Sequence, residues 1–378
     1  MTDAGNRFDI SELAGAFGDL GTLIPFVVAY ISILKMDAAS LFLGFGATLV
    51  AAGFYYRTPF PVQPMKAIGA AAVTQAAGSL LLTKSVVVGA ALATAAIWLF
   101  LGLSGLARRL SAWIPRPALL GVVMGLGFSF MLEGARMMSA HWLLSAALLA
   151  ATLLLARSRL QAMVLLLLAG VVVALAQQPS LADDLALIKP VLHLPEFAWP
   201  ALAWNDVWLG ALFLALPQLP LTFGNALIAI TEENNRLFPD RPVTERKVAI
   251  STGIVNLWSS ALGGIPMCHG AGGMAGHVKF GARTGGASIM LGALLLVLGL
   301  FFADSVGTLF RLFPPSVLGV ILFLAGAELA MGSRDPGPEK VDRFVVLATA
   351  GFAVFNVGIA VLFGFAAYHA SKRGWLKV

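Results

Sequence analysis

Apolar stretches long enough to cross a bilayer follow one another along almost the whole chain. A membrane-spanning helix needs about 20 mostly apolar residues. In the first half, such stretches cover residues 13–34, 38–56, 62–82, 85–107, 117–135, 140–156 and 160–177. In the second half, they cover residues 204–231, 246–263, 266–281, 285–303, 314–331, 343–355 and 357–370. The pattern predicts an all-α integral membrane protein with about 14 transmembrane segments.

The two halves carry matching motifs in the same order. PALLGVV at 117–123 resembles PSVLGVI at 315–321, Pro-Met at 64–65 matches Pro-Met at 266–267, and FGD at 17–19 resembles FGN at 223–225. An odd number of spans in each half would insert the second copy upside down, as in many secondary transporters. We therefore predict a seven-plus-seven inverted repeat, with repeats at residues 1–178 and 204–378 and an extracytoplasmic connector at 179–203.

Composition and charge support a membrane protein and predict its orientation. The chain is 59% hydrophobic and only 12% charged. No soluble domain needs so large a share of apolar residues. Most of the 25 Lys and Arg residues fall in the two termini and in the loops on the same side of the membrane. This distribution predicts a multi-pass protein of the cell inner (plasma) membrane with both termini cytoplasmic. The net charge of +6 then reflects topology, and we expect no nucleic-acid partner.

The third and tenth predicted spans begin with Pro- and Gly-rich segments, TPFPVQPMKA at 58–67 and GGIPMCHGAGGM at 263–274. Proline and glycine disfavour a continuous helix, so we predict broken half-helices at spans 3 and 10. Paired half-helices in transporters point unbonded N–H groups and positive dipole ends at an anion near the membrane midplane. Gly270, Gly272 and Gly273 would let the backbone approach that ligand, although they could instead serve only close helix packing.

Two charged residues lie inside apolar spans. Burying Lys66 costs about 2.5–3.5 kcal/mol, which favours a functional role such as balancing the charge of a substrate. Its alternative role is to extend along the span toward the membrane surface. Asp19 is the candidate for coupling transport to a proton or a sodium ion, and its alternative role is to pair with Lys66 or to cap a broken helix.

Neutral groups complete the predicted substrate site. His269 lies at the expected start of the tenth half-helix, where its ring could donate to an oxoanion. Cys268 is the only cysteine, and one thiol beside one histidine makes a poor metal site, so we expect neither a metal nor another cofactor. The predicted substrate-binding residues are Gln63, Lys66, Ala67, Thr222, Asn225, Cys268, His269, Gly270, Gly272 and Gly273.

Four motifs resemble the molybdate transporter family, a branch of the sulfate permease superfamily. They are FGDLGTLIP at 17–25, PVQPMK at 61–66, PQLPLT at 217–222, and CHGAGG at 268–273 with FGARTG at 280–285. The resemblance implies uptake of a tetrahedral oxoanion, with molybdate as the best candidate. It also implies a core domain of spans 1–4 and 8–11 that moves against a gate domain of spans 5–7 and 12–14. The regulatory domain that ends most sulfate permeases is not expected here.

Other functions fit the sequence less well. The GLSG of residues 102–105 has the form of a membrane serine protease motif but no evident histidine partner, so we expect no enzyme. A nucleobase symporter would use carboxylates in the middle of spans 8 and 10, and this chain has none there. A sulfate transporter of the same fold stays open, as do tungstate as substrate, the coupling ion and a homodimer.

Overall fold

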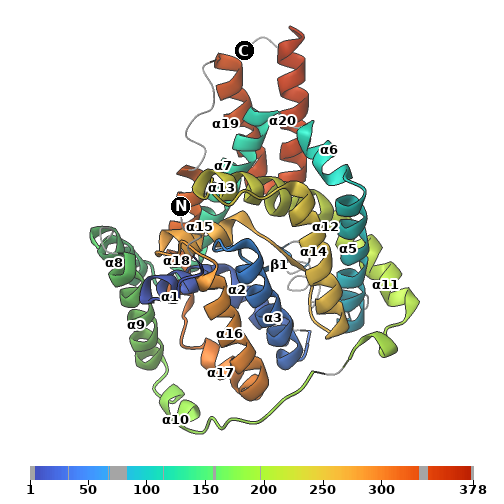
Figure 1. Ribbon diagram of the computed structural model, residues 1–378. Helices are drawn as coiled ribbons and strands as arrows, with labels where there is room; N and C mark the ends of the chain where they lie inside the picture. The colour runs from blue at the N-terminus through green and yellow to red at the C-terminus, as the bar shows by residue number, and fades with distance from the viewer. Residues whose placement is uncertain are drawn as a thin grey trace.

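The computed structural model describes residues 5–32, 34–66, 68, 83–113, 115–155, 159–195, 197–331 and 339–375. These residues form a mostly helical protein (Figure 1). The first half contains α1 (Ile10–Ala16), η1 (Phe17–Asp19), α2 (Leu20–Ser32), α3 (Ala38–Tyr56), β1 (Gln63–Pro64), α5 (Lys84–Leu103), α6 (Leu106–Ala112), α7 (Arg116–Met138), η2 (Ser139–His141), α8 (Trp142–Leu154), α9 (Arg159–Gln177) and α10 (Leu181–Ala186). The second half contains η3 (Trp199–Ala201), α11 (Trp204–Gly210), η4 (Ala211–Ala215), α12 (Leu216–Leu221), η5 (Thr222–Ala229), α13 (Ile230–Leu237), α14 (Glu245–Ala261), β2 (Met267–Cys268), α15 (Ala271–Lys279), α16 (Gly286–Phe301), η6 (Ala303–Ser305), α17 (Val306–Phe310), α18 (Pro315–Met331), α19 (Lys340–Phe355) and α20 (Val357–Lys372).

Several helices have the length and composition of membrane spans. Among the described residues, the helices that are long and apolar enough to cross a bilayer are Ala38–Tyr56, Lys84–Leu103 and Arg116–Leu154. Gly286–Phe301 and Ala303–Phe310 are long and apolar enough when taken together, but they are bent by 98° relative to each other. The first predicted span is not one straight helix, because the 3₁₀ turn η1 separates α1 from α2. Asp19 therefore lies at a break in the helix and not within a regular turn.

Short polar side chains mark where the helices begin. The Asp37 carboxylate accepts a hydrogen bond from the backbone N–H of Ser40 at the start of α3, at 2.7 Å. Thr83 and Asn356 cap α5 and α20 in the same way. A capping side chain supplies one of the acceptors that the first turn of a helix lacks. Asn356 thus explains why the last apolar region forms two short helices, as the sequence predicts.

The chain is extended just before the third and tenth predicted spans turn helical. There β1 and β2 pair antiparallel, with Gln63 opposite Cys268 and Pro64 opposite Met267. The other edge of β2 is covered by the buried Asn256 of α14, whose carboxamide accepts from Met267 N at 2.9 Å and donates to Met267 O at 2.6 Å. Non-helical backbone at membrane depth is tolerated only when protein groups satisfy it. The remainder of the third predicted span, from residue 69, lies outside the described residues.

The eighth predicted span is a helix with two wide turns. The π-helical segments η4 and η5 flank the prolines of α12, and helix continues to Leu237 through α13. Proline lacks the N–H for a regular helical hydrogen bond, so a wider turn nearby relieves the mismatch. The π turn η5 begins at Thr222 and includes Asn225, and such turns often occur at functional sites.

Helices from the two halves pack against each other in pairs. α7 contacts α18, α3 contacts α16, and α5 contacts α14. The α7–α18 pair crosses very closely, because a Cβ atom on Gly127 would lie 2.6 Å from the carbonyl oxygen of Gly326. α8 and α9 lie at one edge of the molecule, and α19 and α20 project from one end (Figure 1). Each of these close pairs joins one helix of the first half to one helix of the second half.

The connector between α10 and α11 crosses the end of the molecule opposite α19 and α20 (Figure 1). It is tied to the second half by hydrogen bonds from His193 N to Leu300 O at 2.7 Å and from Ala198 N to Ala261 O at 2.8 Å. The His193 ring also lies 2.9 Å from the Asp304 carboxylate. The connector is therefore fastened along its length.

Candidate functional site

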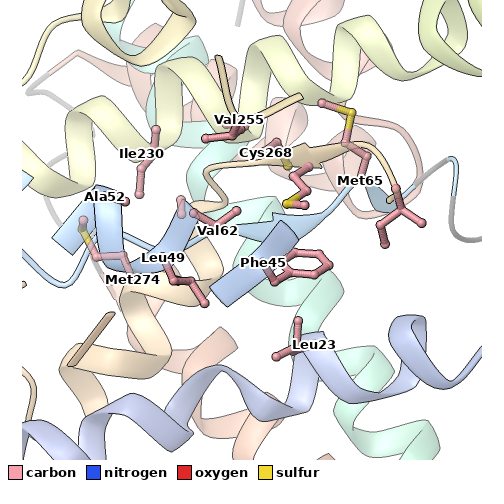
Figure 2. Close-up of a cluster of buried hydrophobic side chains, with 14 of the residues drawn as sticks. Leu23, Phe45, Leu49, Ala52, Val62, Met65, Ile230, Val255, Cys268 and Met274 are labelled. Carbon is pink, nitrogen blue, oxygen red and sulfur yellow. The ribbon is translucent and has the colours of Figure 1, made fainter. Parts of the chain in front are cut away.

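The paired strands lie in a cluster of buried apolar side chains from several elements. Figure 2 shows Met65 and Cys268 beside the strands, with Leu23 of α2 and Phe45 of α3 on one side and Val255 of α14 on the other. This packing holds the starts of the third and tenth spans in one place. Most residues predicted for the site lie on the same two segments, whereas Asp19 comes from η1 and Thr222 and Asn225 come from η5.

Asp19, Gln63 and the first turn of α15 are in direct contact. Asp19 is 2% exposed, and its carboxylate accepts a hydrogen bond from Gln63 Nε2 at 2.5 Å. A Cβ atom on Gly273 would lie 2.7 Å from Gln63 Nε2 and 2.9 Å from Asp19 Oδ2. Only glycine leaves room for both side chains here. The structure thus gives Asp19 the Gln63 carboxamide as a hydrogen-bond partner.

Lys66 lies where the chain turns helical after β1. Its Nζ is buried and has no hydrogen-bond partner among the described residues. Nζ instead faces the ring of Phe130 on α7, 3.3 Å from the ring centroid. The same ring touches the start of α15, because a Cβ atom on Gly272 would lie 1.6 Å from Phe130 Cε2. Lys66, Phe130 and Gly272 therefore meet at one point.

The polar residues of η5 line the adjacent side. Asn225 is 2% exposed, and its Oδ1 has no hydrogen-bond partner in the described part of the chain. Its Nδ2 lies 3.5 Å from the position of a Cβ atom on Gly270. Thr222 accepts a hydrogen bond from Gln218 Nε2 at 2.9 Å and lies 3.9 Å from the Met65 sulfur. Asn225 is therefore the member of this pair that offers a buried carboxamide to a ligand.

His269 has a structural role in this arrangement. One ring nitrogen, Nδ1, lies 2.9 Å from the carbonyl oxygen of Pro61, which can only accept a hydrogen bond. The other, Nε2, lies 2.6 Å from the hydroxyl of Ser251. With Nδ1 donating, the hydroxyl donates to Nε2, so no ring N–H is left for an oxoanion. Contact between His269 and a substrate stays a prediction, and in this arrangement both ring nitrogens are engaged by protein groups.

The structure brings most of the predicted residues together. Gln63, Lys66, Asn225, Gly270, Gly272, Gly273 and Asp19 surround the start of α15, whereas Ala67 lies outside the described residues. The Cys268 side chain, predicted to bind substrate, lies in the buried apolar cluster of Figure 2. Asn256 and Phe130 were missed, because their contacts join segments far apart in sequence.

Groups of opposite charge lie around the start of α15. The helix N-terminus carries a partial positive charge and N–H groups without helical acceptors, and Lys66 adds a full positive charge beside it. The Asp19 carboxylate opposes this field from the Gly273 side. The electrostatic field at this point therefore depends on both Lys66 and Asp19.

A family model and individual relatives both match this chain, and they indicate the same family. The family described as "Molybdate transporter of MFS superfamily" matches residues 11–130 and 210–329, one stretch in each half. Molybdate transporter 2 of Arabidopsis thaliana is 32% identical over 94% of this chain and 85% of its own length. Molybdate transporter 1 of Chlamydomonas reinhardtii is 27% identical over 94% of this chain and 90% of its own length.

Solved structures of anion transporters share the fold. The transmembrane domain of the cyanobacterial bicarbonate transporter BicA matches 93% of this chain and 97% of its own length, with a TM-score of 0.57 and 17% identity. Murine Solute Carrier 26 family member A9, an anion transporter in the inward-facing state, matches 100% of this chain and 70% of its own length, with a TM-score of 0.63 and 13% identity. Together with the family match, these findings identify the chain as a multi-pass membrane transporter, not an enzyme, that belongs to the molybdate transporter family.

Proposed function

We propose that this chain is a secondary active transporter of a tetrahedral oxoanion, with molybdate as its substrate, and that the anion binds between Lys66 and the start of α15. The single observation that carries the proposal is the buried Lys66 Nζ, which has no hydrogen-bond partner among the described residues and lies close to the N-terminus of α15. An ammonium group is costly to bury without an anion. An oxoanion would neutralise it and accept from N–H groups in the first turn of α15 and from the Asn225 carboxamide.

The relatives support molybdate as the substrate. Three curated relatives that match at least 90% of this chain are named molybdate transporters. Sulfate is the second candidate, because both are tetrahedral dianions and a site made of N–H groups and one ammonium can bind either.

We propose the broken-helix arrangement of spans 3 and 10 as the basis of the site. Two observations support a pair of half-helices that start at the same depth. The chain is extended before Lys66 and before Ala271, and the two extended segments pair with each other as β1 and β2. The contacts between helices support the inverted repeat. The repeat would relate span 2 to span 9 and span 4 to span 11. The contact of α3 (span 2) with α16 (span 11) is therefore matched by the contact of α14 (span 9) with α5 (span 4). The family match in each half supports the same repeat.

We further propose that Asp19 couples anion binding to a proton. Its carboxylate is buried beside Gly273, where a negative charge repels an incoming dianion. Protonation would remove that repulsion, so proton and anion would bind together and cross together. Transport then follows from movement of the core, spans 1–4 and 8–11, against the gate, spans 5–7 and 12–14.

Uptake into proteoliposomes tests this function. Radiolabelled molybdate and sulfate would each be measured with and without an inward proton gradient, with the other anion as competitor. We expect saturable molybdate uptake that the gradient accelerates and that excess sulfate inhibits weakly. Preferred sulfate uptake would assign the chain to sulfate transport, and uptake of neither anion would refute oxoanion transport.

A further inference from the structure

Phe130 occupies the place where the proposed site would hold its anion. The ring face lies 3.3 Å from Lys66 Nζ, and the ring edge presses on Gly272 at the start of α15. These are the two positively charged elements of the site. A ring that touches both cannot share that space with a tetrahedral dianion, so ring and substrate exclude each other.

The ring is a reasonable but weak partner for the ammonium. The face of an aromatic ring carries partial negative charge, which attracts a cation, and this attraction is stronger at a desolvated site. The ring has no oxygen to accept from the N–H groups of α15, and it carries no net charge. An oxoanion supplies both, so it can displace the ring from Lys66.

The position of Phe130 is set by the crossing of α7 with α18. Its Cβ lies 2.8 Å from the position of a Cβ atom on Gly326, so the root of the side chain is held against α18. α7 and α18 are the first helices of the two proposed gate segments. Any displacement of the ring therefore changes a contact between these helices and the elements that hold the anion.

We propose that Phe130 is a built-in competitor for the substrate, which holds α7 on the empty site through Lys66 and releases it when the anion binds. This inference rests on the proposed function and adds a positioning residue to it. The empty site is closed by an attractive contact between gate and core. Anion binding replaces that contact, so the gate is freed only when the site is filled.

The test measures molybdate binding to purified protein by isothermal titration calorimetry. Phe130→Leu removes the aromatic face, and we expect molybdate affinity to rise about tenfold because the competitor is weakened. Phe128→Leu is the matched control on the same helix, since Phe128 is 43% exposed and should leave affinity unchanged. If Phe130 were instead a wall of the binding site, its replacement would lower affinity, and that result or an unchanged affinity would overturn the proposal.

A second variant keeps the size of the side chain. Replacing Phe130 with 3,4,5-trifluorophenylalanine removes most of the negative charge of the ring face and should also tighten molybdate binding, even if Phe130→Leu does not fold. Unchanged or weaker binding by the fluorinated protein would refute the competition. Measuring molybdate binding to the wild-type protein distinguishes failure of the proposed function from failure of the Phe130 inference. If the wild type binds no molybdate, the proposed function fails and this inference fails with it; if it binds and the variants do not bind more tightly, only the inference fails.

Discussion

At the scale of single residues, the proposed site contains two buried groups of opposite charge, Lys66 and Asp19, which contact different neighbours. Lys66 faces an aromatic ring, and Asp19 accepts from a carboxamide. In the proposed mechanism, the positive charge attracts the anion and the carboxylate takes up the proton.

Replacing Lys66 tests the positive member. Lys66→Met should weaken molybdate binding about 10- to 100-fold, the value expected when a hydrogen bond to a charged group is lost. Folded yield should not fall, because the change removes a buried charge. Lys84→Met is the control, since Lys84 lies exposed at the start of α5. Unchanged affinity in Lys66→Met would exclude this residue from the site, and calorimetry on both proteins decides the point.

Replacing Asp19 tests the negative member. Asp19→Asn keeps an oxygen that accepts from Gln63 but removes the titratable charge. We expect the variant to exchange molybdate across a liposome membrane while failing to accumulate it on a proton gradient. Asp240→Asn, in an exposed loop, should behave as the wild type. Gradient-driven accumulation by Asp19→Asn at the wild-type rate would remove Asp19 from coupling.

At the scale of elements, the loop between α15 and α16 is attached to α1 through one buried carboxylate. Glu12 precedes the first predicted span, and its Oε1 accepts from the backbone N–H groups of Arg283 and Thr284, each at 2.9 Å. Its other oxygen is buried with no hydrogen-bond partner among the described residues. Burial raises the pKa of Glu12 to about 7. The folded protein therefore favours the protonated form of Glu12.

This raised pKa predicts how stability depends on pH. A carboxyl whose pKa is higher in the folded state contributes stability at pH values below its unfolded pKa, and that contribution is lost as pH rises through about 7. The thermal midpoint of the purified protein should fall by a few degrees between pH 5.5 and 8, as estimated from about 2–4 °C per kcal/mol. Glu12→Gln keeps an acceptor oxygen and should flatten this dependence. The same slope in Glu12→Gln and wild type would assign it to another group.

At the scale of the whole molecule, the helices of the two halves are interleaved rather than placed side by side. α7 crosses α18 and β1 pairs with β2, so neither half forms its own site. The site is made only when both halves meet, which is what alternating access around a central ligand requires.

The proposed orientation can be tested by labelling intact cells. Ser180→Cys, at the start of the predicted connector 179–203, should react with a membrane-impermeable maleimide added outside the cell. Arg108→Cys should react only after permeabilisation. Both positions are exposed, and the native Cys268 is 3% exposed and should stay unlabelled. The reverse pattern would invert the orientation, and labelling of both from outside would contradict the order of spans between them.

The family and the positions where the chain leaves the helical pattern could be predicted from sequence, because they depend on local properties. Continuous apolar stretches predict membrane helices wherever water is excluded. Proline and glycine at 58–64 and 263–273 predict where helix gives way to extended chain, and the structure has extended chain before Lys66 and Ala271. Each of these signals lies within one segment and needs no partner.

The partners of the site residues were decided by the tertiary structure alone. Gln63 bonds to Asp19, Asn256 covers β2, and both ring nitrogens of His269 are engaged. The ring of Phe130, predicted by no motif, lies on Lys66. The sequence by itself determined that this is a membrane transporter, and it predicted where charges and Pro- and Gly-rich segments interrupt the apolar spans. Only packing between helices distant in sequence decided which groups those charges meet, because a buried polar group takes its partner from whatever the fold places within reach.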